Sequence, residues 1–116
     1  MKQISRLLLF ALTVATLTGC ATPGELSRKS PVIEYDSQKP AREVTSCISK
    51  KWAEYTSMIT SLVTDTGYSI SLQHPMAGTD ATAVIEDKGT GSHVRYSERI
   101  AWLSPEWMSK PILDCK

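Results

Sequence analysis

Tyr68-Ser69-Ile70-Ser71-Leu72-Gln73 is the stretch that decides the fold, because hydrophobic and polar side chains alternate along it without a break. This period of two places Tyr68, Ile70 and Leu72 on the same face of a β-strand. One face of the predicted strand is therefore apolar, and another layer of the protein has to cover it.

Further strands are predicted on both sides of this stretch. Two of them cover residues 81–87 and 92–99, and a short fourth strand over 61–64 would extend the sheet. The connections contain glycine, proline and aspartate, which favour turns. Because short links join strands that are neighbours in a sheet, we expect an antiparallel meander of three or four strands.

An amphipathic helix is predicted upstream of the strands, over residues 41–59. Hydrophobic side chains recur there at helical spacing, with Val44, Ile48, Trp52 and Tyr55 on one side. Trp52 and Tyr55 have two interpretations, a platform for a ligand or part of the core, and at this spacing we expect them to lie in the core. The predicted fold class is thus α+β, with one amphipathic N-terminal helix packed on the meander.

The C-terminal tail is rich in large apolar side chains, Trp102, Trp107 and Met108 among them. Residues 104–110 are predicted to form a short helical turn that ends at Pro111. Two interpretations are open. Either these side chains close the end of the small core, or Trp102 and Trp107 stay partly exposed and anchor a protein partner, since tryptophan is enriched at binding hot spots. Trp102, Trp107 and Met108 are therefore the candidate partner contacts.

The N-terminus has the features of a secretion signal. Lys2 and Arg6 precede an apolar run that ends at Leu17. A membrane-spanning helix needs about 20 apolar residues, and this run is about half as long. The segment closes with Leu17-Thr18-Gly19-Cys20, which resembles the lipobox of bacterial lipoprotein precursors: an aliphatic residue and two small residues precede a cysteine.

The resemblance implies a lipid-anchored protein. Cleavage between Gly19 and Cys20 would make Cys20 the lipidated N-terminus, and two or more acyl chains anchor a protein stably. In this family an aspartate after the cysteine retains the protein in the inner membrane. Ala21 stands there instead, which implies the outer membrane, with the domain facing the periplasm. The alternative is an ordinary secretory signal with the same small residues as its cleavage site.

The resemblance extends loosely beyond the lipobox. The order of Cys47, Trp52 and a terminal tryptophan followed by a cysteine is similar to small uncharacterised proteobacterial outer-membrane lipoproteins. It implies no particular activity.

Three segments are predicted: a signal peptide over 1–19, the lipidated cysteine with a flexible tether over 20–40, and a small α+β periplasmic domain over 41–116. The tether has no apolar periodicity and contains several prolines. A chain of this kind reaches on the order of 25 Å. Val32–Tyr35 is a short β-prone exception, which docks either on its own domain or on a partner.

The cysteines predict a covalent link within the domain. With Cys20 taken by lipid, Cys47 and Cys115 remain, and export places both in an oxidising compartment. Simple counting then pairs them in a disulfide. A zinc site or a catalytic thiol lacks support, because neither cysteine has a CxxC partner or a neighbouring histidine.

Catalytic and metal-binding patterns are weak in this sequence. Asp65-Thr66-Gly67 matches a tripeptide of aspartic proteases but is expected to be a turn, and the two histidines, His74 and His93, are far apart. The basic residues outside the signal nearly balance the 12 acidic ones and are interspersed, so we expect no nucleic-acid binding. We therefore expect a protein without catalytic activity, without a metal site and without a cofactor.

The expected function is that of a non-catalytic accessory or interaction subunit of a cell-envelope complex, held at the membrane by its lipid. The alternative is a periplasmic small-ligand-binding or enzyme-inhibitor module that presents the loop from His74 to Asp80.

Overall fold

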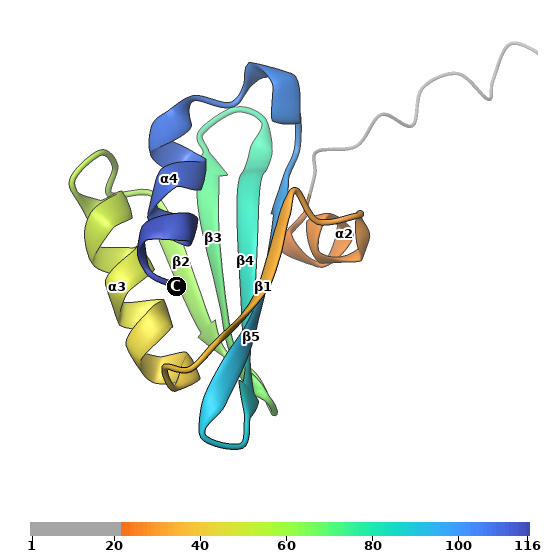
Figure 1. Ribbon diagram of the computed structural model, residues 1–116. Coiled ribbons are helices and arrows are strands. Elements are labelled where there is room, and N and C mark those ends of the chain that lie inside the picture. Colours follow the sequence, from red (N-terminus) through yellow and green to blue (C-terminus); the bar gives the residue numbers. More distant parts are fainter. Residues whose placement is uncertain (1–21) are drawn as a thin grey trace, which may run out of the picture.

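A five-stranded antiparallel sheet forms the centre of the structure, a computed structural model that describes residues 22–116 (Figure 1). Its strands are β1 (Ile33–Ser37), β2 (Ile59–Val63), β3 (Gly67–His74), β4 (Gly78–Lys88) and β5 (Gly91–Glu98). They lie in the spatial order β1-β5-β4-β3-β2, so that β1 and β2 are the two edges. Every neighbouring pair is antiparallel.

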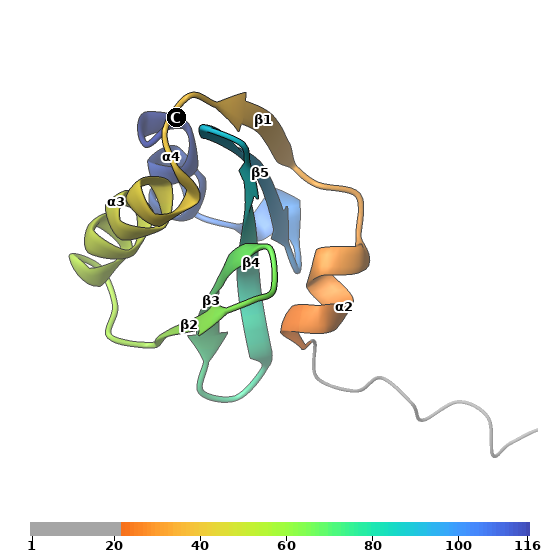
Figure 2. The same ribbon diagram turned by 90° about the horizontal axis from the view of Figure 1, so that it is seen from below.

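Helices lie on both faces of this sheet (Figure 2). The inner face packs against α3 (Ala41–Ala53) and α4 (Glu106–Asp114), and the outer face carries α2 (Pro23–Arg28). A short 3₁₀ helix, η1 (Ala101–Leu103), precedes α4. The predicted architecture of one N-terminal helix on a three- or four-stranded meander is therefore wrong. The sheet has a fifth strand, and α3 shares the inner face with a second helix.

The additional strand, β1, comes from the segment that was expected to be a flexible tether. Its side chains alternate: Ile33 and Tyr35 pack against the core, whereas Glu34 and Asp36 are exposed. The Tyr35 hydroxyl donates a hydrogen bond to the backbone carbonyl of Ile112 in α4. Of the two alternatives for Val32–Tyr35, docking on its own domain is the one observed. Pairing with β5 supplies the backbone hydrogen bonds that a short isolated segment cannot make.

The helix α2 also occupies part of the predicted tether. Thr22 caps it: the Thr22 hydroxyl accepts a hydrogen bond from the Glu25 amide, and the Glu25 carboxylate accepts one from the Thr22 amide. This capping box satisfies two amides that the helix itself leaves free. Leu26 is 1% exposed, because it packs against the sheet under α2. Part of the segment predicted as a tether, from Thr22 to Ser37, is therefore folded onto the sheet as α2 and β1.

The predicted helix over 41–59 is shorter in the structure. It ends at Ala53, and Ile59 begins β2. Trp52 is fully buried as predicted, but Tyr55 follows the helix and is 61% exposed, so its assignment to the core is wrong. Helical periodicity assigns a residue to a face only as far as the helix extends.

The C-terminal segment is longer than the predicted turn. α4 has nine residues and continues through Pro111 to Asp114. A proline inside a helix removes one backbone hydrogen bond. Burial offsets this loss, because Ile112 and Cys115 are fully buried on the inner face. The indole N–H of Trp52 donates a 2.9 Å hydrogen bond to the Met108 carbonyl and ties α4 to α3.

The disulfide between Cys47 and Cys115 is confirmed. Their Cα atoms are 5.8 Å apart, and the bond closes a separation of 68 residues. It joins the middle of α3 to Cys115, the residue that caps the C-terminal end of α4. The Trp52 hydrogen bond joins the same two helices. Two independent links thus hold the last helix of the chain on the inner face.

We predict that Leu26→Ala destabilises the protein by about 2 kcal/mol or more, because it removes a fully buried side chain from under α2. Leu113→Ala is the matched control: Leu113 is 56% exposed, and its loss should change stability by less than about 0.5 kcal/mol. Urea unfolding of both variants measures the difference. Equal midpoints would mean that residues 22–28 are not part of the folded domain.

Replacing both Cys47 and Cys115 with serine should lower the free energy of unfolding by up to about 4 kcal/mol, the chain-entropy value for a loop of this length. A reducing agent should shift the wild-type unfolding midpoint in the same direction and leave the double variant unchanged. A midpoint of the wild type that is insensitive to reductant would contradict the link.

Candidate functional site

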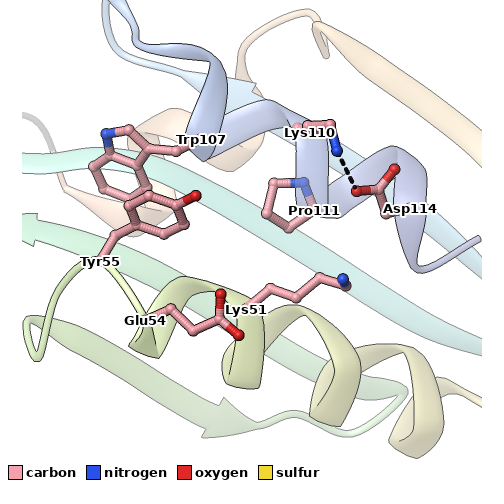
Figure 3. A pocket seen from close by; sticks show the side chains of 7 residues that line it. All are labelled: Lys51, Glu54, Tyr55, Trp107, Lys110, Pro111 and Asp114. Atoms are coloured by element: carbon pink, nitrogen blue, oxygen red, sulfur yellow. Dashed lines mark hydrogen bonds and ion pairs between the residues drawn. The ribbon is translucent and has the colours of Figure 1, made fainter.

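A groove between α3 and α4 is the clearest candidate for a binding site (Figure 3). At one end the rings of Tyr55 and Trp107 stack, with centroids 5.1 Å apart and planes 12° from parallel. The groove has a volume of about 170 Å³, smaller than the roughly 300 Å³ of typical small-molecule sites. Its lining residues are Lys51, Glu54, Tyr55, Trp107, Lys110, Pro111 and Asp114.

The polar wall of this α3–α4 groove carries charges of both signs. Lys51 and Glu54 come from the C-terminal end of α3, whereas Lys110 and Asp114 lie one turn apart on α4. The ammonium of Lys110 is 3.2 Å from the Asp114 carboxylate. An exposed ion pair of this kind contributes little to stability, so both groups can exchange partners at little cost. An aromatic platform beside exchangeable charges suits a polypeptide segment better than a single small molecule.

The three candidate partner contacts are placed in different environments. Trp107 is half-buried in the α3–α4 groove, and Trp102 is 83% exposed on η1, outside that groove. Met108 is only 4% exposed, and its carbonyl is occupied by Trp52. The structure therefore brings Trp107 together with Tyr55, places Trp102 elsewhere on the surface, and uses Met108 in the core.

Tyr55 is the aromatic residue of the groove that the sequence analysis assigned to the core in preference to a ligand platform; of the residues that line the groove, Trp107 alone was named as a candidate contact. It continues the apolar stripe of the predicted helix, which is why it was assigned to the core. The signal that would have found it is the run of Thr56 and Ser57 directly after it, since such residues favour helix ends over helix interiors. With the helix ended there, Tyr55 is free to stack on the outer side of Trp107.

A second cavity lies where β3 ends and β4 begins, beside the predicted loop of His74 to Asp80. Much of that loop is strand: β3 runs to His74 and β4 begins at Gly78. The His74 ring accepts hydrogen bonds from the Met76 and Ala77 amides, so it stabilises the turn. The cavity has a volume of about 200 Å³ and is lined by His74, Asp80, Arg99, Ile100, Leu103, Ser104, Pro105 and Met108.

A cluster of charged side chains holds β1 against β5 on the outer face. Asp36 and Glu34 lie 2.6 and 2.8 Å from the two ring nitrogens of His93, and Asp36 also pairs with Lys88 at 3.2 Å. The hydrogen bonds to Asp36 and then to Glu34 raise the pKa of His93 above its ordinary 6.5. The same bond to His93, followed by that to Lys88, lowers the pKa of Asp36. This cluster links side chains of β1 to side chains of β4 and β5 and so stabilises the edge strand.

The lipobox, Leu17-Thr18-Gly19-Cys20, lies outside the described residues. Between Thr22 and Lys116, no helix is long and apolar enough to cross a membrane. In the same part of the chain, no three histidine, cysteine, aspartate or glutamate side chains are grouped as a metal site. A scan against protein-family models and searches of curated proteins and of solved structures found no match to this chain.

The His93 cluster predicts a pH dependence of stability. Because the folded state raises the pKa of His93, its contribution is fully present below pH 6.5 and is lost as pH rises through the folded pKa. The unfolding midpoint of the wild type should therefore decrease with rising pH in this window. His93→Gln should flatten that slope, and His74→Gln is the control, since His74 faces no carboxylate in its hydrogen bonds. An unchanged slope in His93→Gln would contradict the assignment.

Proposed function

We propose that this protein is a lipid-anchored outer-membrane lipoprotein that faces the periplasm and acts non-catalytically as an accessory or interaction subunit of a cell-envelope complex. Two features support the proposal. Leu17-Thr18-Gly19-Cys20 has the residue types of a lipobox, and an exposed aromatic platform stands on a domain in which a disulfide links α3 to the end of α4. The exposed aromatic platform is the main observation that supports a role in binding another protein.

The Tyr55–Trp107 platform suits a protein partner for a physical reason. Tyr55 keeps 61% of its surface exposed although it stacks on Trp107, so a large apolar area meets water at a rigid position. Tyrosine and tryptophan are enriched at binding hot spots because they bury much area at a low cost in side-chain entropy. The charged residues Lys51, Glu54 and Asp114 line the rest of the groove beside it (Figure 3), and polar residues of this kind are typical of the rim of an interface.

Lipidation of Cys20 restricts the kind of partner. A protein with two or more acyl chains stays in one membrane, so it meets mainly proteins of the same envelope layer. High local concentration then allows a modest surface to bind productively, because the second contact of an anchored pair is effectively intramolecular. An accessory subunit of a membrane-associated assembly is the role that follows.

The cavity beside His74 is the observation behind a second candidate function, a periplasmic module that binds a small ligand or inhibits an enzyme. Its volume of about 200 Å³ is below the range of typical ligand sites, and His74 is already engaged by the turn. Binding that is lost in His74→Ala and retained in Tyr55→Ala would favour this candidate.

The test is photo-crosslinking in intact cells with a photoreactive residue at position 55. We expect one stoichiometric envelope protein to be attached there. Position 113 is the matched control, because Leu113 is similarly exposed and does not line the groove. Tyr55→Ala should remove the partner from a mild-detergent purification with little loss of thermal stability. Equal adducts at both positions, or none at position 55, would contradict the interaction role of the groove.

Anchoring is tested separately in the same cells. Cys20→Ser should move the protein from the membrane fraction to the soluble fraction. Membrane association that persists in Cys20→Ser would contradict the lipid anchor, whatever the result at position 55.

A further inference from the structure

Three of the most exposed large apolar side chains gather at one end of the domain. Met76 is 85% exposed in the turn between β3 and β4, and Trp102 and Leu103 are 83% and 61% exposed on η1. These two segments lie at the same end of the sheet, at the top of Figure 1. They also meet around one cavity, since His74 and Leu103 both line it. We call Met76, Trp102 and Leu103 the apolar end.

The N-terminal helix is tied to this same region. The Lys29 ammonium, just after α2, donates a 3.0 Å hydrogen bond to the Arg99 carbonyl, two residues before η1 begins. Leu26 fixes α2 on the outer face of β4 and β5. The helix α2, which follows Thr22 directly, is therefore coupled through Lys29 to the segment that carries Trp102.

The distance from the lipid to the fold is short as a consequence. Only Ala21 lies between Thr22 and the candidate lipidated Cys20, so the two Cα atoms are at most about 7 Å apart along an extended chain. A free tether over 20–40 would have allowed roughly 25 Å, enough to clear the head groups. With α2 and β1 folded onto the sheet, the domain stays within reach of the bilayer surface.

We propose that the apolar end docks into the interfacial region of the membrane to which Cys20 is anchored. This inference rests on the proposed lipidation of Cys20. Tryptophan favours this region, because its ring is apolar and its N–H finds partners among the head groups. Met76 and Leu103 would bury their side chains beside it, and the exposed Arg28 and Lys29 are cationic groups that lipid phosphates attract.

Docking also orients the rest of the molecule. The α3–α4 groove belongs to the inner-face helices, on the opposite side of the sheet from α2 (Figure 2). The membrane would therefore contact one end of the sheet and leave the groove open. In this orientation the aromatic platform of Tyr55 and Trp107 is available to a partner in the same membrane.

The experiment measures how close Trp102 is to lipid. The mature protein, purified from membranes, is reconstituted into vesicles of phosphatidylethanolamine and phosphatidylglycerol that contain a dibrominated phosphatidylcholine. Bromine quenches tryptophan emission at short range. The difference between wild type and Trp102→Phe isolates the signal of Trp102, because Trp52 and Trp107 are common to both. Trp52, which is fully buried, serves as an internal reference that the lipid cannot reach.

Insertion by roughly 5–10 Å into the boundary between head groups and acyl chains should lower the Trp102 emission about twofold and shift it to shorter wavelength. The double variant Met76→Ser and Leu103→Ser should abolish this quenching without changing the circular dichroism spectrum, because both side chains are exposed. Equal Trp102 emission in vesicles with and without the dibrominated lipid would overturn the docking.

The two failures are distinguishable by flotation of the vesicles. Protein that does not float with them has no anchor, and the proposed function fails together with this inference. Protein that floats while Trp102 remains unquenched is anchored but not docked, and only this inference is overturned. An envelope protein crosslinked at position 102 in cells, with no quenching by lipid, would assign the apolar end to a protein partner instead.

Discussion

The attachment of α4 to α3 across the inner face of the sheet is the constraint on which the rest of the structure depends. Two links make it, the Cys47–Cys115 disulfide and the hydrogen bond from the Trp52 indole to the Met108 carbonyl. The disulfide acts mainly on the unfolded chain, whereas the hydrogen bond fixes the position of α4 in the folded state. Without them the apolar face of a domain this small would lose the cover that α4 provides, and neither the α3–α4 groove nor the stacked Tyr55–Trp107 pair would form.

The two ends of the described chain are held on the sheet by different kinds of interaction. At the C-terminus a covalent bond retains a helix that a proline would otherwise weaken. At the N-terminus no covalent link is described: the pairing of β1 with β5, the burial of Leu26 under α2 and the charges of the His93 cluster hold the segment on the sheet. The N-terminal segment is therefore the more easily detached part. If Cys20 is lipidated, detachment would change the distance between the domain and the membrane while the core and the groove stay intact.

The sequence predicted the features that depend on local pattern and failed where tertiary context decides. Alternation along residues 68–73 and counting of cysteines led to β3 and to the disulfide, both of which are present. β1 was foreseen only in part, as the β-prone stretch Val32–Tyr35 that docks either on its own domain or on a partner. α2 was missed because its one buried side chain, Leu26, leaves no period to detect. The length of α4 was missed because burial of Ile112 overrides the local effect of Pro111. Of the candidate site, Trp107 was predicted and Tyr55 was not, since the groove joins two helices distant in sequence.

The central claim is that a lipid on Cys20 holds a domain that begins almost directly after it. The intact mass of the protein extracted from the membrane tests this most directly. The account predicts a chain that starts at Cys20, carries a diacylglyceryl group and a further acyl group on that residue, and lacks two hydrogens because of the Cys47–Cys115 bond. A chain that starts elsewhere, or one with an unmodified Cys20, would contradict it.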